Sequence, residues 1–210
     1  MAEPTDLDTL ARRLADLART GRAVCAIAGA PGSGKSTLAE QLVERLNEAE
    51  PGSAALLPMD GFHYDDLYLV PAGLRPRKGS PETFDVGGLR HTILRLRAND
   101  EDAVAVPVFD RDIEIARAGA RLIPSSVRVI VCEGNYLLLQ RSPWNSLLPL
   151  FDATVLIDVP EEELRRRLRL RWEGYNLTDD QIAWKLDGND LPNGRVVMEE
   201  SAPAQYVVRP

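Results

Sequence analysis

The chain has 210 residues, 44% of them hydrophobic, which suits one α/β domain with a substantial core and leaves little room for a second. Its formal net charge of −7 and the scattered placement of its arginines argue against nucleic acid as the main partner. No apolar run approaches the roughly 20 residues of a membrane span, and the N-terminus lacks a signal-peptide pattern, so we expect a cytoplasmic protein without a membrane partner.

The N-terminal segment predicts an amphipathic helix over residues 5–20. Apolar residues recur along one side of it at helical spacing, Gly21 follows its end, and Thr5 with Asp8 fits a capping box at its start. We expect this helix to pack beside a sheet without contributing chemistry.

A strand, a glycine-rich loop and a helix follow in direct succession. Residues 23–28 form an unbroken run of small and β-branched side chains, typical of a strand buried on both faces, and apolar residues recur at helical spacing from Leu38 onward. Between them, Gly29-x4-Gly34-Lys35-Ser36 has the spacing of a P-loop, which binds the phosphates of a nucleoside triphosphate through backbone N–H groups and a helix N-terminus. In this motif the lysine reaches the β- and γ-phosphates and the serine hydroxyl binds Mg²⁺. The predicted nucleotide-binding residues are Gly29, Ala30, Pro31, Gly32, Ser33, Gly34, Lys35, Ser36 and Thr37.

A second predicted strand, over residues 54–59, ends at Asp60. Open α/β sheets place their ligands at the carboxyl ends of parallel strands, so this carboxylate is a candidate site residue. Residues 61–77 have no regular period, which is typical of a functional loop or lid. A helix over 86–97 and a small hairpin formed by 103–109 and 120–123 are predicted next.

The predicted strand over residues 127–132 leads into Glu133, which has the place of a Walker B carboxylate that holds Mg²⁺ or its water. The alternative is a strand-end glutamate in a salt bridge. Cys25 and Cys132 both fall in predicted buried strands, and we expect reduced core thiols. Strands over 153–159 and 205–208 complete a predicted parallel sheet of five strands.

Arginines dominate the helix predicted after Pro160. A charge run of this kind is commonly a solvated face. In a P-loop protein, however, arginines on a mobile segment can close over the triphosphate and neutralise charge during transfer. We expect at least one of them to have this role, with residues 178–186 as the returning helix of the lid and 189–194 as a turn.

In this order, the segments resemble the P-loop kinases that include uridine kinase, phosphoribulokinase and type I pantothenate kinase, and within them a small bacterial group named as fructose transport system kinases. The resemblance implies an α/β three-layer sandwich with a five-stranded parallel core sheet and helices on both faces. It further implies one domain over 1–210, with an acceptor-binding insertion over 61–126 and a lid with an adenine-side turn over 161–190.

The same resemblance implies individual roles. The segment Met59–His63 resembles the one that carries the base, here Asp60, and Pro107–Asp110 resembles the acceptor-binding strand. Residues 132–138 are similar to the Walker B region, so that Ser36 and Glu133 are the expected Mg²⁺ ligands. Arg167 and Arg171 correspond to lid arginines, and the adenine is expected beside Asn189, Pro192 and Asn193.

The chain also departs from uridine kinases. Those enzymes carry an Asp-His pair before the proline aligned with Pro81, and its aspartate holds the ribose hydroxyls, whereas Gly79 and Ser80 stand here. Lys78, next to them, has an ammonium that suits a carboxylate, a phosphate or a sugar oxygen better than a diol. We therefore expect uridine and cytidine to be poor acceptors. The expected acceptor-binding residues are His63, Tyr64, Lys78, Asp110 and Arg111.

The leading hypothesis is an ATP- and Mg²⁺-dependent kinase that phosphorylates a hydroxyl of a sugar, nucleoside or vitamin-like acceptor. Asp60 would act as base, with Lys35, Arg167 and Arg171 stabilising the transferred group. The alternative is an ATP-hydrolysing regulatory or assembly protein without a metabolite acceptor. The expected partners are ATP and a small-molecule acceptor, and a homodimer is a further hypothesis.

Overall fold

A parallel six-stranded sheet forms the centre of the computed structural model, which describes residues 2–210. The strand order is β1-β8-β7-β2-β6-β3, so the strand that precedes the P-loop lies between β7 and β6. The strands are β1 (Glu3–Pro4), β2 (Ala23–Gly29), β3 (Ala54–Pro58), β6 (Val129–Glu133), β7 (Ala153–Ile157) and β8 (Tyr206–Val208).

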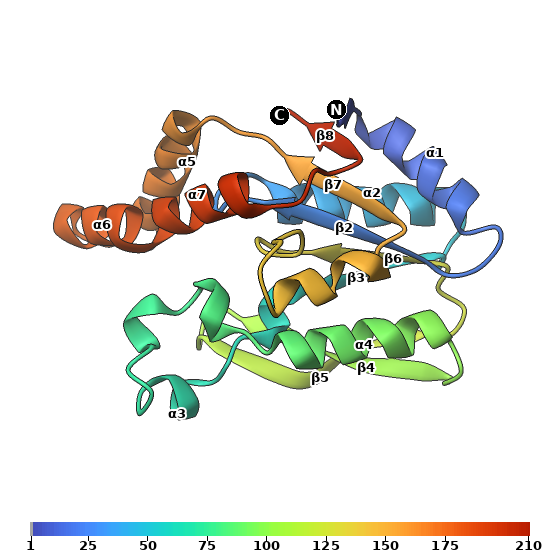
Figure 1. The fold of residues 1–210 in the computed structure, drawn as a ribbon, viewed down its shortest axis with the longest axis horizontal. Coiled ribbons are helices and arrows are strands. Elements are labelled where there is room, and N and C mark those ends of the chain that lie inside the picture. Colours follow the sequence, from blue (N-terminus) through green and yellow to red (C-terminus); the bar gives the residue numbers. More distant parts are fainter. Residues whose placement is uncertain (1) are drawn as a thin grey trace.

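Helices cover both faces of this sheet (Figure 1). The alternation of side chains along a strand sends Cys25 and Ile27 of β2 to one face and Val24 and Ala26 to the other. The first face packs against α1, α2 and α5, and the second against α4, α7 and the hairpin described below. The helices are α1 (Leu7–Leu17), α2 (Lys35–Ala49), α3 (Asp66–Leu69), α4 (Val86–Ala98), α5 (Glu161–Gly174), α6 (Asp179–Lys185) and α7 (Leu191–Glu200). The structure thus has the predicted three layers.

The acceptor-side insertion, residues 61–126, consists of irregular chain, the helices α3 and α4, and a hairpin. Short 3₁₀ helices cover Met59–Phe62, Arg75–Arg77 and Pro81–Thr83, so the irregular segment contains α3 and isolated turns. The antiparallel strands β4 (Ala103–Asp110) and β5 (Ile115–Pro124) form the hairpin, with a bulge between Val106 and Val108. In Figure 1 the insertion, in green, lies below the sheet, and α5 and α6 extend on the same side as α3.

Three sequence predictions need correction. The sheet has six parallel strands instead of five, because the two-residue strand β1 pairs with β8. Asp6, and not Thr5, caps α1, since its carboxylate accepts from the Thr9 N–H at 2.7 Å. Residues 189–194 are no turn: a π-helix over Leu186–Asp190 continues directly into α7.

Both cysteines are free and fully buried in two neighbouring interior strands, Cys25 in β2 and Cys132 in β6, as predicted. Burial raises the pKa of the Cys25 thiol to about 12 and that of the Cys132 thiol well above its usual value. Among residues 2–210, the helices are all too short or too polar to cross a lipid bilayer.

Candidate active site

The loop between β2 and α2 has the backbone that a phosphate cradle requires. Gly32 and Gly34 have φ angles of 79° and 92°, in the left-handed region that residues other than glycine seldom adopt. A Cβ on Gly29 would lie 2.5 Å from Ser33 Oγ, so the turn at the strand end also requires glycine. α2 begins at Lys35 and directs its N-terminus toward the loop.

Glu133 lies beside this loop because β6 pairs with β2 in register, with Glu133 opposite Ile27. The Ser36 hydroxyl donates to Glu133 Oε2 at 3.2 Å, and the carboxylate is only 5% exposed. Burial and the negative charge of Asp60 raise the pKa of Glu133, although Lys35 and the Ser36 hydrogen bond oppose this shift. A hydroxyl and a buried carboxylate in contact next to a phosphate cradle fit a magnesium ion, which prefers oxygen ligands and takes the rest from phosphate and water.

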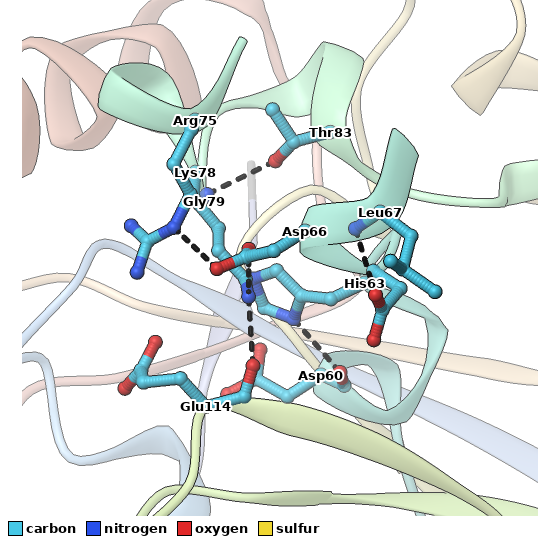
Figure 2. Close-up of polar contacts among 10 residues, drawn as sticks. Asp60, His63, Asp66, Leu67, Arg75, Lys78, Gly79, Thr83 and Glu114 are labelled. Carbon is cyan, nitrogen blue, oxygen red and sulfur yellow. Dashed lines mark hydrogen bonds and ion pairs between the residues drawn. The ribbon is translucent and has the colours of Figure 1, made fainter. Parts of the chain in front are cut away.

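Asp60 stands just beyond the carboxyl end of β3, in the first 3₁₀ turn. Its carboxylate pairs with Arg111 at 2.6 Å, and its carbonyl lies 2.8 Å from His63 Nδ1 (Figure 2). Burial favours the neutral acid, but the positive charges of His63, Arg111 and Lys35 outweigh it and hold the pKa of Asp60 below its usual value. The carboxylate is therefore ionised at neutral pH and able to accept a proton.

A cavity of about 460 Å³ joins the P-loop to the insertion. Nine of the predicted site residues line it: Pro31, Lys35, Asp60, His63, Lys78, Arg111, Arg171, Asn189 and Asn193. Two predicted acceptor residues do not. Asp110 pairs with Arg117 at 2.7 Å, and Tyr64 packs against Tyr68 in a tilted arrangement with ring centroids 5.0 Å apart.

The acceptor side of the cavity is held by main-chain contacts around Gly79. This glycine has a φ of 99°, its N–H donates to Thr83 Oγ1 at 3.0 Å, and its carbonyl accepts from the Tyr136 hydroxyl at 2.7 Å. Gly79 has no side chain to offer a ligand, and its N–H and carbonyl are already bonded within the protein. The neighbouring Lys78 supplies the polar group at this place.

The two predicted lid arginines have different surroundings. Arg167 donates to Glu163 Oε1 at 2.7 Å and to the Ser33 carbonyl at 3.3 Å, so it lies against the P-loop. Arg171 lies over the Trp172 ring, 5.2 Å from its centroid, and lines the main cavity. The neighbouring helical turn brings Leu168 so close to Gly32 that an added Cβ would meet it at 2.9 Å.

The predicted adenine-side residues lie close to both Lys78 and the P-loop, since a Cβ on the adjacent Gly194 would lie 3.4 Å from Ala30 Cβ. Asn189 donates to the Lys78 carbonyl at 3.3 Å, Asn193 donates to Asn189 at 3.1 Å, and Pro192 lines neither cavity. A second hollow of about 280 Å³ adjoins the start of α2 and is lined by Gly34, Thr37, Leu38, Gln41, Ile157, Arg167 and Val208, among others.

Sequence reasoning missed several residues that line the main cavity. Arg75 reaches it from a 3₁₀ turn, and the run Arg75-Pro76-Arg77-Lys78 was a visible cluster of cations. Asp190 reaches it from the π-helix, where its carboxylate accepts from Trp172 Nε1 at 2.7 Å. π-helical turns are frequent at functional sites, but the sequence carries no signal for one here.

The chain resembles known kinases in sequence and in structure. No protein-family model matches it. A provisionally named uridine kinase of Schizosaccharomyces pombe is 33% identical over 181 residues, which cover 82% of this chain and 76% of that protein. A pantothenate kinase of Mycolicibacterium vanbaalenii is 30% identical over 142 residues, which cover 67% of this chain and 45% of that protein. Among solved structures, a provisionally named fructose transport system kinase from Silicibacter sp. TM1040 is 38% identical, with a TM-score of 0.88, and the match covers 98% of this chain and 100% of that one.

Proposed function

Because this chain belongs to the P-loop kinases that include uridine kinase and pantothenate kinase, and is thus an ATP-dependent small-molecule kinase, we propose that it phosphorylates a hydroxyl of a small polar metabolite with Asp60 as general base. One observation carries the proposal. The P-loop lysine and an ionised strand-end carboxylate line the same cavity, and the insertion and the segment from α5 to α7 provide the rest of its lining.

The proposed reaction follows from these positions. The acceptor oxygen forms a bond to the γ-phosphorus of ATP while the bond from that phosphorus to the β,γ-bridging oxygen breaks. The hydroxyl proton passes to Asp60, whose Oδ2 accepts from Arg111 and whose Oδ1 is left for the acceptor. Lys35 and Arg171 stabilise the charge that develops on the transferred group.

Magnesium completes the proposed donor site. Ser36 and Glu133 would hold it together with phosphate oxygens and water, and the ion would neutralise phosphate charge.

The nucleotide base is better placed in the second hollow than beside Asn189. The first turn of α2 and Arg167 line that hollow next to Gly34, and a planar guanidinium is suited to stack on an aromatic base. Asn189 and Asn193 line the main cavity together with Lys78, and we assign them to the acceptor instead. In this arrangement Arg167 binds the base and Arg171 acts on the phosphoryl group.

The test separates transfer from hydrolysis. ATP turnover is measured alone and with a panel of hydroxyl compounds, and products are read by mass. An acceptor should accelerate ADP formation and gain one phosphate, whereas acceptor-independent hydrolysis would support the regulatory alternative. Asp60→Asn should lower transfer about 10²-fold while ATP affinity stays unchanged, because the amide cannot take the proton. If ATP affinity falls as far as transfer, Asp60 is a structural or metal-binding residue.

A further inference from the structure

Two cations on the acceptor side of the main cavity share one carboxylate. Arg75 Nε lies 2.6 Å from Asp66 Oδ2, and Lys78 Nζ lies 2.8 Å from Asp66 Oδ1 (Figure 2). Both cations line the cavity, while Asp66 does not. This cluster therefore has one positive charge more than its aspartate can balance.

Lys78 holds that charge in a fixed and nearly enclosed place. Its side chain is only 5% exposed, and its ammonium also donates to the Glu114 carbonyl at 2.7 Å. Glu114 has a φ of 55°, an uncommon conformation for a residue other than glycine, and it turns this carbonyl toward Lys78. Glu114 also lines the cavity, but among residues 2–210 its carboxylate pairs with neither Lys78 nor Arg75, whose ion-pair partner is Asp66. Since an ammonium has three N–H donors and two are used, one is left for a ligand.

The surplus charge lies on the same wall as the proposed base. His63 links the two, because its Nδ1 contacts the Asp60 carbonyl, and the pKa of its imidazole is lowered first by burial and further by the charge of Lys78. The Phe109 ring lies beside both, 4.7 Å from the His63 ring and 5.5 Å from Lys78 Nζ. An acceptor whose hydroxyl meets Asp60 thus extends past His63 toward Lys78.

We propose that the acceptor is a small hydroxy acid, whose carboxylate binds between Lys78 and Arg75 while its hydroxyl lies at Asp60. The proposal rests on the proposed function, since it names the substrate class of the same site. A carboxylate carries the single negative charge that the cluster lacks, whereas a phosphate monoester carries about −1.5 to −2 at neutral pH. The unused N–H groups of the Arg75 guanidinium also match the two oxygens of a carboxylate.

Matched acids and neutral analogues provide the test. Pantothenate is compared with panthenol, and glycerate with glycerol, both as ligands in thermal-shift titrations with a non-hydrolysable ATP analogue and as acceptors with saturating ATP. Each acid should bind the wild-type protein about 10- to 100-fold more tightly than its neutral partner, the range of a hydrogen bond to a charged group.

Lys78→Met should remove this preference by weakening the acid about 10- to 100-fold, while affinity for the neutral partner and for ATP stays unchanged. Lys78→Arg should restore part of it. Arg90→Met is the matched control, because Arg90 is an exposed cation of α4 outside both cavities. If Lys78→Met does not fold, Arg75→Met should show the same selective loss.

The outcomes separate the two proposals. If the neutral analogues bind as tightly as the acids, or if glycerol phosphate binds more tightly than glycerate, the hydroxy-acid assignment is wrong. If the acids bind through Lys78 but no hydroxyl compound is phosphorylated, the charge assignment stands and the proposed function fails.

Discussion

Gly61→Ala tests whether the catalytic carboxylate depends on close packing between its 3₁₀ turn and the hairpin. Gly61 directly follows Asp60 and faces the bulge of β4 at Pro107. A Cβ at residue 61 would lie 2.4 Å from the Pro107 carbonyl oxygen, where ordinary contacts begin at 3.4 Å. The two backbones would therefore have to separate by about 1 Å, and backbone atoms cannot rotate away as a side chain can.

The expected cost follows from that separation. Forcing an extra methyl into a packed site costs about 1–3 kcal/mol of unfolding free energy. The displacement also acts on the pair between Asp60 and Arg111, which joins the turn to the end of the hairpin. A shift of about 1 Å in a catalytic group can lower turnover about 10²-fold. We thus expect Gly61→Ala to lose both stability and kcat.

Urea unfolding measures the loss of stability. Steady-state turnover, with an acceptor that the wild-type enzyme phosphorylates, measures the loss of kcat. Gly21→Ala is the control, because nothing lies within 4 Å of its added Cβ, and its unfolding free energy should change by less than about 0.5 kcal/mol. A Gly61→Ala protein with wild-type midpoint and wild-type kcat would refute the reasoning.

Two further predictions concern the donor side. Arg171→Ala should lower kcat with little change in the KM for ATP, whereas Arg167→Ala should mainly raise that KM; the reverse pattern would exchange their proposed roles. Because burial and Asp60 raise the pKa of Glu133, its stabilising contribution is present below the usual value of 4.5 and is lost as pH rises through the raised pKa. Glu133→Gln should therefore raise the Tm of the ligand-free protein at pH 8 but not at pH 4, and should abolish the magnesium-dependent stabilisation by ATP. A lower Tm than wild type at pH 8 would contradict the assigned direction.

Sequence patterns predicted the parts of the site that depend on local order. The P-loop could be recognised because its glycines, Lys35 and Ser36 are contiguous, and Asp60 and Glu133 because each follows a buried strand. The three-layer fold followed from the same strands. Strand β1 was missed, since two exposed residues show no periodicity.

Tertiary contacts and backbone detail explain the remaining misses. Lys78 meets the Glu114 carbonyl across 36 residues, and no local pattern indicates that contact. Pro192 and Gly194 indicated a turn, but the π-helix over Leu186–Asp190 runs directly into α7, and Pro192 is accommodated as the second residue of that helix. Tyr64 and Asp110 were assigned to the site from the chemistry of their side chains, which does not fix their direction.

Alkylation of the two buried cysteines can report on local opening of the sheet. Only a thiolate reacts readily with alkylating reagents, and burial suppresses ionisation at both Cys25 and Cys132. Modification therefore requires that the neighbouring strands β2 and β6 open, and each thiol reports on a different strand of the same pair. Pulsed alkylation read by mass would show whether this pair, which carries both the P-loop and Glu133, opens as one cooperative unit, and whether bound ATP slows that opening.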